Sequence, residues 1–151
     1  MTEWSSVDDI LAFAIANEEK AHAFFLQLAE AVEAEAIKAT LLGFAAEELG
    51  HKRRLEQLRD GHVEARWVQQ KVQDLKIADY LADVAPKPGL SFQEALIVAM
   101  KQELAAIKLY EALAKAAPAP LDDVFRGLAQ EEAKHKLRFE IVYDEGILAE
   151  G

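Results

Sequence analysis

The sequence contains no cysteine, and this absence excludes several kinds of site. Disulfide bonds, thiolate catalysis and cysteine-ligated metal centres all require a thiol. Basic residues are also few, because 17 Lys and Arg stand against 27 Asp and Glu and leave a net charge of −10. Nucleic acids and anionic membrane surfaces both require basic patches on their partners, so we expect neither as a partner of this chain.

Long apolar runs are missing too, and none approaches the roughly 18 residues that a membrane-spanning helix needs. The N-terminal segment MTEWSSVDDI lacks the basic and then apolar stretch of a signal peptide, so a cytoplasmic location is expected. What the chain does have is 52% apolar and 29% charged residues over 151 positions. This profile is typical of a globular protein with a buried core, and residues 1–151 are predicted to form one domain.

Apolar residues recur at helical spacing along four segments, and no segment shows the alternation of a β-strand. The first helix is predicted over about 7–32 with Ser6 as its N-cap, and the second over 35–59. Short turns of the kind between these segments make consecutive helices antiparallel. The first two helices are therefore expected to form a hairpin.

The second half of the chain repeats this arrangement. The stretch SFQE, from Ser91, matches a capping box that opens a third helix, and AAPAP, at 116–120, ends it. The fourth helix is predicted to end near Asp144, just before Gly146. Residues 60–90 are long enough to cross the bundle and include a candidate short helix around KVQDLKIADYLA. We therefore predict an all-α fold, a four-helix bundle of two hairpins joined by one long crossover.

Two segments carry the same acid and imidazole pattern, Glu-Glu-x-x-His. They are FAAEELGHKRRLEQL, from Phe44, and GLAQEEAKHKLRFEI, from Gly127. In each segment the second Glu and the His lie on the apolar stripe of the helix, three residues apart and therefore on one face. The other two stripes are also interrupted near their centres by a Glu. The interrupting residues are Glu18, Glu48, His51, Glu103, Glu132 and His135.

The spacing of these acids predicts that they meet in one layer. The midpoint of positions 18 and 48 is 33, inside the first turn, and the midpoint of 103 and 132 falls within AAPAP. Each acid is thus about 15 residues from its turn, or roughly 22 Å at 1.5 Å per residue. Buried carboxylates must pair with cations, take up protons or bind metal, and four together repel one another. No Lys or Arg lies on any of the four stripes.

Metal satisfies the charge count, because two divalent cations balance four carboxylates and two neutral imidazoles complete the ligand set. We therefore predict a dinuclear metal site held by Glu18, Glu48, His51, Glu103, Glu132 and His135. The alternative is a metal-free structural network of buried acids and histidines.

The segments NEEKAHAFFLQLAE, AAEELGH, KQELAAIKLYEALA and AQEEAKH resemble the four helices of rubrerythrin-like di-iron proteins of the ferritin-like superfamily. The resemblance implies a ferritin-like bundle that holds two iron ions, with manganese or zinc able to take the same site. It selects Glu18 rather than Glu19 as a ligand, with Glu103 as its counterpart. It also implies that Glu48 and Glu132 bridge or chelate the metals and that each histidine ligates one of them.

Two departures from this family bear on function. Position 106 is Ala where rubrerythrins carry a further carboxylate, and their small Cys-ligated iron domain has no counterpart in this cysteine-free chain. The remaining set of four Glu and two His is closer to the ferroxidase centre of bacterioferritins. The resemblance therefore implies a di-iron oxidoreductase that reacts with hydrogen peroxide or dioxygen, acts in oxidative stress and takes electrons from an external donor such as a rubredoxin-like protein. The alternatives are iron handling by ferroxidation and a metal-free structural bundle.

For several other residues the sequence allows more than one role. The hydroxyl of Tyr110 is predicted to hold a ligand carboxylate or to donate a proton or electron; the alternative is core packing, the role of its repeat mate Phe25. Glu47 and Glu131 precede the ligand acids and are expected in solvent or beside the ligands. His22 and His62 are expected at the rim and in solvent, respectively. A homodimer is also an expectation, with Trp4 and Trp67 as candidate interface residues.

Overall fold

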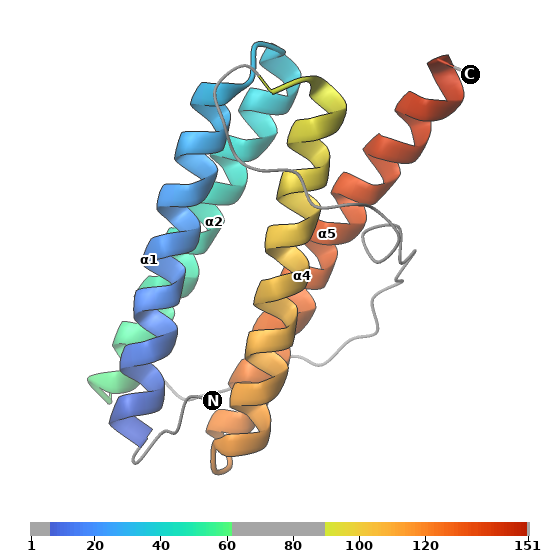
Figure 1. Cartoon of the computed structure of the whole chain (residues 1–151). Helices are drawn as coiled ribbons and strands as arrows, with labels where there is room; N and C mark the ends of the chain where they lie inside the picture. Colours follow the sequence, from blue (N-terminus) through green and yellow to red (C-terminus); the bar gives the residue numbers. More distant parts are fainter. Residues whose placement is uncertain (1–6, 62–89, 151) are drawn as a thin grey trace.

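The computed structural model describes residues 7–61 and 90–150, with side chains through residue 145. Four long α-helices run side by side through this part of the chain, and no strand occurs in it (Figure 1). They are α1 (Val7–Ala31), α2 (Glu35–Arg59), α4 (Phe92–Ala116) and α5 (Leu121–Glu150). The predicted all-α four-helix bundle is therefore confirmed.

The helices form two antiparallel hairpins. Helix α1 packs mainly against α2, and α4 packs mainly against α5. The α4–α5 turn includes a cis peptide bond between Ala119 and Pro120. The proposed Ser6 cap, nearly all of the crossover with its short helix, His62 and both tryptophans lie outside the described residues. The assignment of 1–151 to one domain stays a prediction.

Local sequence explains the start of α4 and the end of α2. Ser91 caps α4 as predicted: the Glu94 N–H donates to Ser91 Oγ at 3.1 Å, and the Ser91 N–H donates to Glu94 Oε1 at 3.1 Å. Beyond α2, Gly61 has a φ of 75°, a left-handed conformation that glycine adopts without strain. The predicted end of the fourth helix near Asp144 is wrong, because α5 continues to Glu150. A single glycine costs a helix only about 1 kcal/mol relative to alanine, and no proline follows it here.

The core consists of two apolar clusters, which lie toward opposite ends of the bundle axis and each include residues of all four helices. One cluster includes Phe25, Leu41, Phe44, Leu96, Met100 and Phe139. The other includes Leu11, Leu55, Tyr110, Leu113, Phe125 and Leu128. The interrupting acids and histidines of all four stripes fall between the two clusters along the helices. The fold therefore encloses an ionisable layer between two apolar ones.

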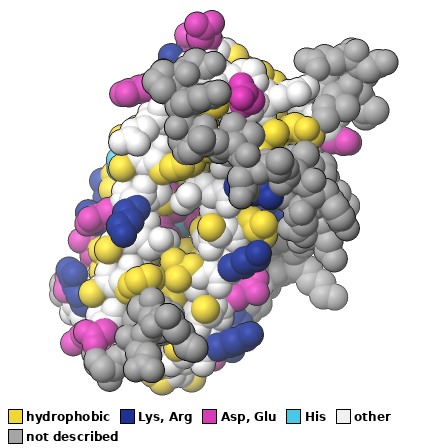
Figure 2. All heavy atoms as spheres, viewed as in Figure 1, with side chains coloured by type: hydrophobic (Ala, Val, Ile, Leu, Met, Phe, Trp, Pro, Cys, Tyr) yellow, Lys and Arg dark blue, Asp and Glu magenta, His cyan; other side chains and the backbone are white. Residues whose placement is uncertain are grey.

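Charged side chains of both signs are spread over the outside of the bundle. Figure 2 shows apolar side chains along the middle of one face, with acidic and basic side chains distributed around them. Among the helices of the described part, none has both the length and the apolar character that crossing a membrane demands.

Candidate metal centre

The structure brings all six predicted residues together in the middle of the bundle. The four carboxylates are almost completely buried, and the two histidine side chains are at most 10% exposed. They form two overlapping groups in which one candidate ligand atom per residue lies within 4.8 Å of the others. The first group is Glu18, Glu48, His51 and Glu132; the second is Glu48, Glu103, Glu132 and His135. Glu48 and Glu132 are thus shared by both groups.

The two imidazoles approach this layer in the same manner. His51 Nδ1 lies 3.4 Å from a Glu132 oxygen and 3.7 Å from an oxygen of Glu18 and of Glu48. His135 Nδ1 lies 3.4 Å from an oxygen of Glu48 and 3.6 Å from an oxygen of Glu103 and of Glu132. The two rings are nearly parallel, at 10°, with centroids 6.4 Å apart. Both Nδ1 atoms therefore face the carboxylates, as two ligands of a common centre would.

Tyr110 joins the layer from the second apolar cluster. Its hydroxyl donates a hydrogen bond to Glu18 Oε1, so it links α4 to a carboxylate on α1. Burial, followed by the charges of Glu18 and Glu132, raises the pKa of Tyr110 well above its ordinary value and keeps the phenol protonated. Its repeat mate Phe25 instead packs in the first cluster, where it stacks on Phe139 at 6.4 Å between centroids.

A second contact reaches the layer from the surface. Glu47 Oε2 lies 2.7 Å from His135 Nε2 and pairs with the imidazole, although the Glu47 side chain is 54% exposed. On its other side, the His135 ring stacks on Phe44 with centroids 4.1 Å apart and an angle of 16°. The ring of His135 is therefore held both by the Glu47 carboxylate and by packing.

His22 has a more specific place than the rim position predicted for it. Its Nδ1 lies 2.7 Å from the Ala45 carbonyl oxygen, and the side chain is half-buried. Since Ala45 belongs to α2, this hydrogen bond ties α1 to α2 about one turn from Glu18 and Glu48. The sequence shows the position of His22 on α1 but not the carbonyl that it meets.

The pKa values of the buried acids shift in opposite directions: those of Glu18 and Glu103 rise, and that of Glu132 falls. Burial, reinforced by Glu48, raises the pKa of Glu18 to about 8. Burial and the charge of Glu132 likewise raise the pKa of Glu103 well above its ordinary value. For Glu132 the effect of burial is outweighed by its close contacts with Glu103, His135 and His51, which hold its pKa below the usual range.

The same carboxylates also shift the pKa values of the two imidazoles. Burial alone would lower their pKa values, but the close carboxylates of Glu132, Glu18 and Glu48 raise the pKa of His51 to about 12. The close carboxylates of Glu103, Glu132 and Glu48 likewise raise the pKa of His135 above the ordinary value. Without metal, the layer therefore limits its negative charge by holding protons.

The donor atoms of the layer fit a dinuclear metal centre. Several buried atoms have no hydrogen-bond partner: Glu18 Oε2, Glu48 Oε1, both oxygens of Glu103, Glu132 Oε1 and His135 Nδ1. Leaving so many buried polar atoms unsatisfied is costly unless another group binds them. Carboxylate oxygens and imidazole nitrogens suit iron, manganese and zinc.

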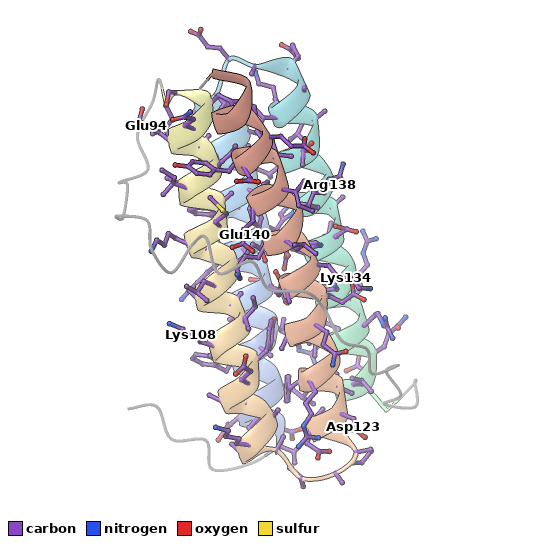
Figure 3. All side chains as sticks on the ribbon, turned by 90° about the vertical axis from the view of Figure 1, so that its right-hand side faces the viewer. Glu94, Lys108, Asp123, Lys134, Arg138 and Glu140 are labelled. Atoms are coloured by element: carbon purple, nitrogen blue, oxygen red, sulfur yellow. The ribbon has the colours of Figure 1, made fainter. Side chains whose placement is uncertain are left out.

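A buried ion pair that was not predicted from the sequence lies beside this layer. Lys136 and Glu140 are 2% and 0% exposed, and Lys136 Nζ lies 3.1 Å from Glu140 Oε1. Figure 3 shows Glu140 on the α4 side of α5, whereas Lys134 and Arg138 project on the α2 side. Lys136 lies beside the apolar stripe rather than on it, so the stripe did not identify it. The spacing of four residues from Glu132 to Lys136 and on to Glu140 was the available signal.

Comparison with known proteins agrees with this geometry. The family model described as Rubrerythrin matches residues 9–83 and 94–150. A hypothetical protein from Pyrococcus furiosus has a similar structure at 22% identity, with a TM-score of 0.63 over 93% of this chain and 89% of that one. A protein from Thermotoga maritima described as a ferritin-like diiron-carboxylate protein is also similar at 22% identity, with a TM-score of 0.67 over 97% of this chain and 99% of that one. At this identity the two structures support the fold. No curated protein matches the sequence.

Proposed function

This chain belongs to the rubrerythrin family, and we propose that it is a non-haem di-iron oxidoreductase that reacts with hydrogen peroxide or dioxygen. One observation carries the proposal: four carboxylates and two imidazoles converge in a buried layer with unsatisfied donor atoms aimed into it. A structural network would satisfy its own polar atoms. This layer leaves them available to cations.

The six residues divide naturally between two metal ions. Glu18 and His51 would hold one ion, Glu103 and His135 would hold the other, and the shared acids Glu48 and Glu132 would contribute to both. Two bound iron ions would supply the two electrons that, with two protons, reduce hydrogen peroxide to two water molecules. Manganese or zinc can compete for the same oxygen and nitrogen donors.

The surrounding residues hold this centre in place and keep water away from it. The two apolar clusters lie on either side of the layer along the bundle axis. Tyr110 holds Glu18 through its hydroxyl and brings a buried O–H group to the edge of the layer. The reduction of peroxide needs two electrons, and we expect an external donor such as a rubredoxin-like protein to supply them.

Iron handling by ferroxidation is the second candidate, and Ala106 favours it. This buried residue occupies the position at which rubrerythrins carry a further carboxylate, which leaves the centre with four Glu and two His. A centre of this kind could oxidise ferrous iron and release it without sustained turnover of peroxide.

Anaerobic ferrous titration followed by oxidation tests the proposal. Elemental analysis should approach two iron ions per chain, and the loaded protein should consume peroxide or dioxygen repeatedly when a reductant is supplied. The double variant Glu18→Gln/Glu103→Gln, which removes one charge from each hairpin, should lose iron and activity together. A burst that stops after one oxidation of the bound iron would favour ferroxidation. Iron content near zero in the wild-type protein would contradict both functions.

A further inference from the structure

We propose that a groove on the outer side of the bundle, between α2 and α5, binds a small organic acid that also carries a hydroxyl group. The groove has a volume of about 370 Å³, which is within the range of small-molecule sites. Its lining residues come from α2, except for the last, which belongs to α5: Ala39, Thr40, Gly43, Phe44, Glu47 and Arg138. This site lies outside the central layer and does not depend on the proposed oxidoreductase function.

Arg138 supplies a positive charge at the edge of the groove. It is exposed on the α2 side of α5 (Figure 3), and its guanidinium lies 5.7 Å from the centroid of the Phe44 ring. No carboxylate of the described residues pairs with it, although the chain has 27 acidic and only 17 basic residues. A guanidinium presents its N–H donors in a fork that matches the two oxygens of a carboxylate. Arg138 therefore favours an anionic group on the ligand.

Hydrogen-bond acceptors line another part of the same groove. Glu47 Oε2 lies 2.7 Å from His135 Nε2, and the exposed Glu47 side chain keeps Oε1 for a second partner. Thr40 Oγ1 donates its hydrogen to the Ala36 carbonyl oxygen at 3.1 Å, so it can only accept from a ligand. Within the described structure, Glu47 and Arg138 line one groove without pairing with each other. A ligand with a carboxylate for Arg138 and a hydroxyl for Glu47 or Thr40 satisfies both.

Gly43 keeps the groove open on the α2 side. Glycine in a helix interior is less stable than alanine, so its presence in the middle of α2 needs a reason. Packing within the chain does not supply one, because a Cβ at this position would meet nothing within 4 Å. The missing side chain instead exposes the backbone of α2 beside the apolar surfaces of Ala39 and Phe44. The body of a small ligand can lie against this surface.

The groove borders the central layer through the two residues that hold His135. Phe44 stacks on the imidazole with centroids 4.1 Å apart, and Glu47 pairs with its Nε2. A ligand that contacts Phe44 and Glu47 therefore touches both supports of a predicted metal ligand. Its binding should change the visible absorption of Co²⁺ bound in the layer, a consequence that rests on the metal centre of the proposed function.

NMR titration of the metal-free protein with 4-hydroxybenzoate tests the site itself. The wild-type protein should bind one equivalent, with the largest chemical-shift changes at the groove residues. Gly43→Leu fills the groove and should abolish binding. Gly50→Leu is the matched control, because a Cβ at Gly50 also meets nothing within 4 Å and Gly50 does not line the groove. Far-UV circular dichroism confirms that both variants are folded. Binding that survives in Gly43→Leu, or no binding to the wild-type protein, would overturn the proposal.

Ligand analogues test the assigned contacts. Benzoate lacks the hydroxyl and phenol lacks the carboxylate, so each should bind about tenfold more weakly than 4-hydroxybenzoate. Arg138→Gln should weaken 4-hydroxybenzoate by a similar factor and leave phenol unchanged, whereas Lys134→Gln, which alters another exposed cation of α5, should change neither. Equal affinities for the three compounds would contradict these contacts.

The link to the central layer is measured separately on the Co²⁺-loaded protein. Saturating 4-hydroxybenzoate should shift the visible spectrum of the wild-type protein and leave that of Gly43→Leu unchanged. An unshifted wild-type spectrum would show that the groove and the layer are not coupled. Failure of Co²⁺ to bind at all would contradict the metal centre, whereas the titration of the metal-free protein would still decide whether the groove binds its ligand.

Discussion

A buried carboxylate needs a compensating charge, and the residues of the central layer can obtain it in two ways. Without metal, Glu18 and Glu103 retain protons because burial raises their pKa values, and the histidines are charged because carboxylates surround them. With metal, the acids must ionise and the imidazoles must be neutral, so cations replace the protons. Glu18, Glu103 and the two histidines therefore favour the metal-free protein at low pH and the metal-bound protein at high pH.

This exchange predicts that the metal-free protein loses stability as pH rises from about 6 to about 9. The pKa of Glu18 rises from 4.5 to about 8 on folding, and that of His51 rises from 6.5 to about 12. The native state therefore binds more protons than the unfolded state in this range, and stability falls with increasing pH. The contribution of each group is complete below its unfolded pKa and is lost as pH rises through its folded pKa. Glu132, whose pKa is lowered, acts in the opposite direction only in acid.

Thermal melting of the chelator-treated protein at several pH values measures this effect. The zinc-loaded protein is the control, because its ligands hold no protons to lose and its melting temperature should not fall over the same range. A metal-free protein whose melting temperature is constant or rises from pH 6 to 9 would contradict the assigned protonation of the layer.

Residues whose chemistry conflicts with their position could be identified from the sequence alone. Glu18, Glu48, Glu103 and Glu132 interrupt apolar stripes, and the structure places them together, although their roles as ligands stay a prediction. The partner of Tyr110 could not be predicted, since its stripe placed it near Glu103 while its hydroxyl reaches Glu18 on the other hairpin. A contact of this kind depends on how α1 and α4 are placed across the bundle, which periodicity within one helix does not determine.

At the scale of the helix, strong local signals gave accurate boundaries and weak ones did not. The bounds of α2 agree with the prediction, and Ser91 caps α4 through the expected pair of hydrogen bonds. The predicted end of the fourth helix was wrong because Gly146 weakens the helix but keeps its backbone N–H, whereas a proline would remove it. The burial of Lys136 and Glu140 was also missed, because the buried face of α5 is wider than its apolar stripe.

The cap of α4 is a local feature whose contribution can be measured. Ser91→Ala removes the acceptor of the Glu94 N–H and should lower the free energy of unfolding by about 1 kcal/mol. Urea denaturation of the metal-free protein avoids any contribution from metal binding. Ser91→Thr keeps a hydroxyl acceptor and should retain most of the stability. Equal midpoints for the alanine variant and the wild-type protein would show that the capping box does not stabilise α4.

At the scale of the whole molecule, the central layer is where the two hairpins depend on each other. Each hairpin packs chiefly within itself, α1 on α2 and α4 on α5. Each of the two groups of ligands nevertheless contains residues from both hairpins, because Glu48 and Glu132 are common to both groups. Bound metal would therefore cross-link the hairpins at the level of the buried acids.

Metal should accordingly stabilise the whole bundle rather than one helix. A ligand that binds only the native state adds about 2.7 kcal/mol per site to the free energy of unfolding at a concentration 100 times its Kd. Zinc should therefore raise the melting temperature of the metal-free wild-type protein and slow amide hydrogen exchange in both hairpins. The variant Glu18→Gln/Glu103→Gln replaces the two acids that hold protons in the metal-free layer with neutral amides. Its metal-free form should therefore melt close to the metal-free wild type at pH 6 and at a higher temperature than the wild type at pH 9. It should gain little from zinc, because it has lost a charged ligand at each metal position. An equal gain in both proteins would place the bound zinc elsewhere on this acidic surface, and protection confined to one hairpin would show that the metal does not link the two.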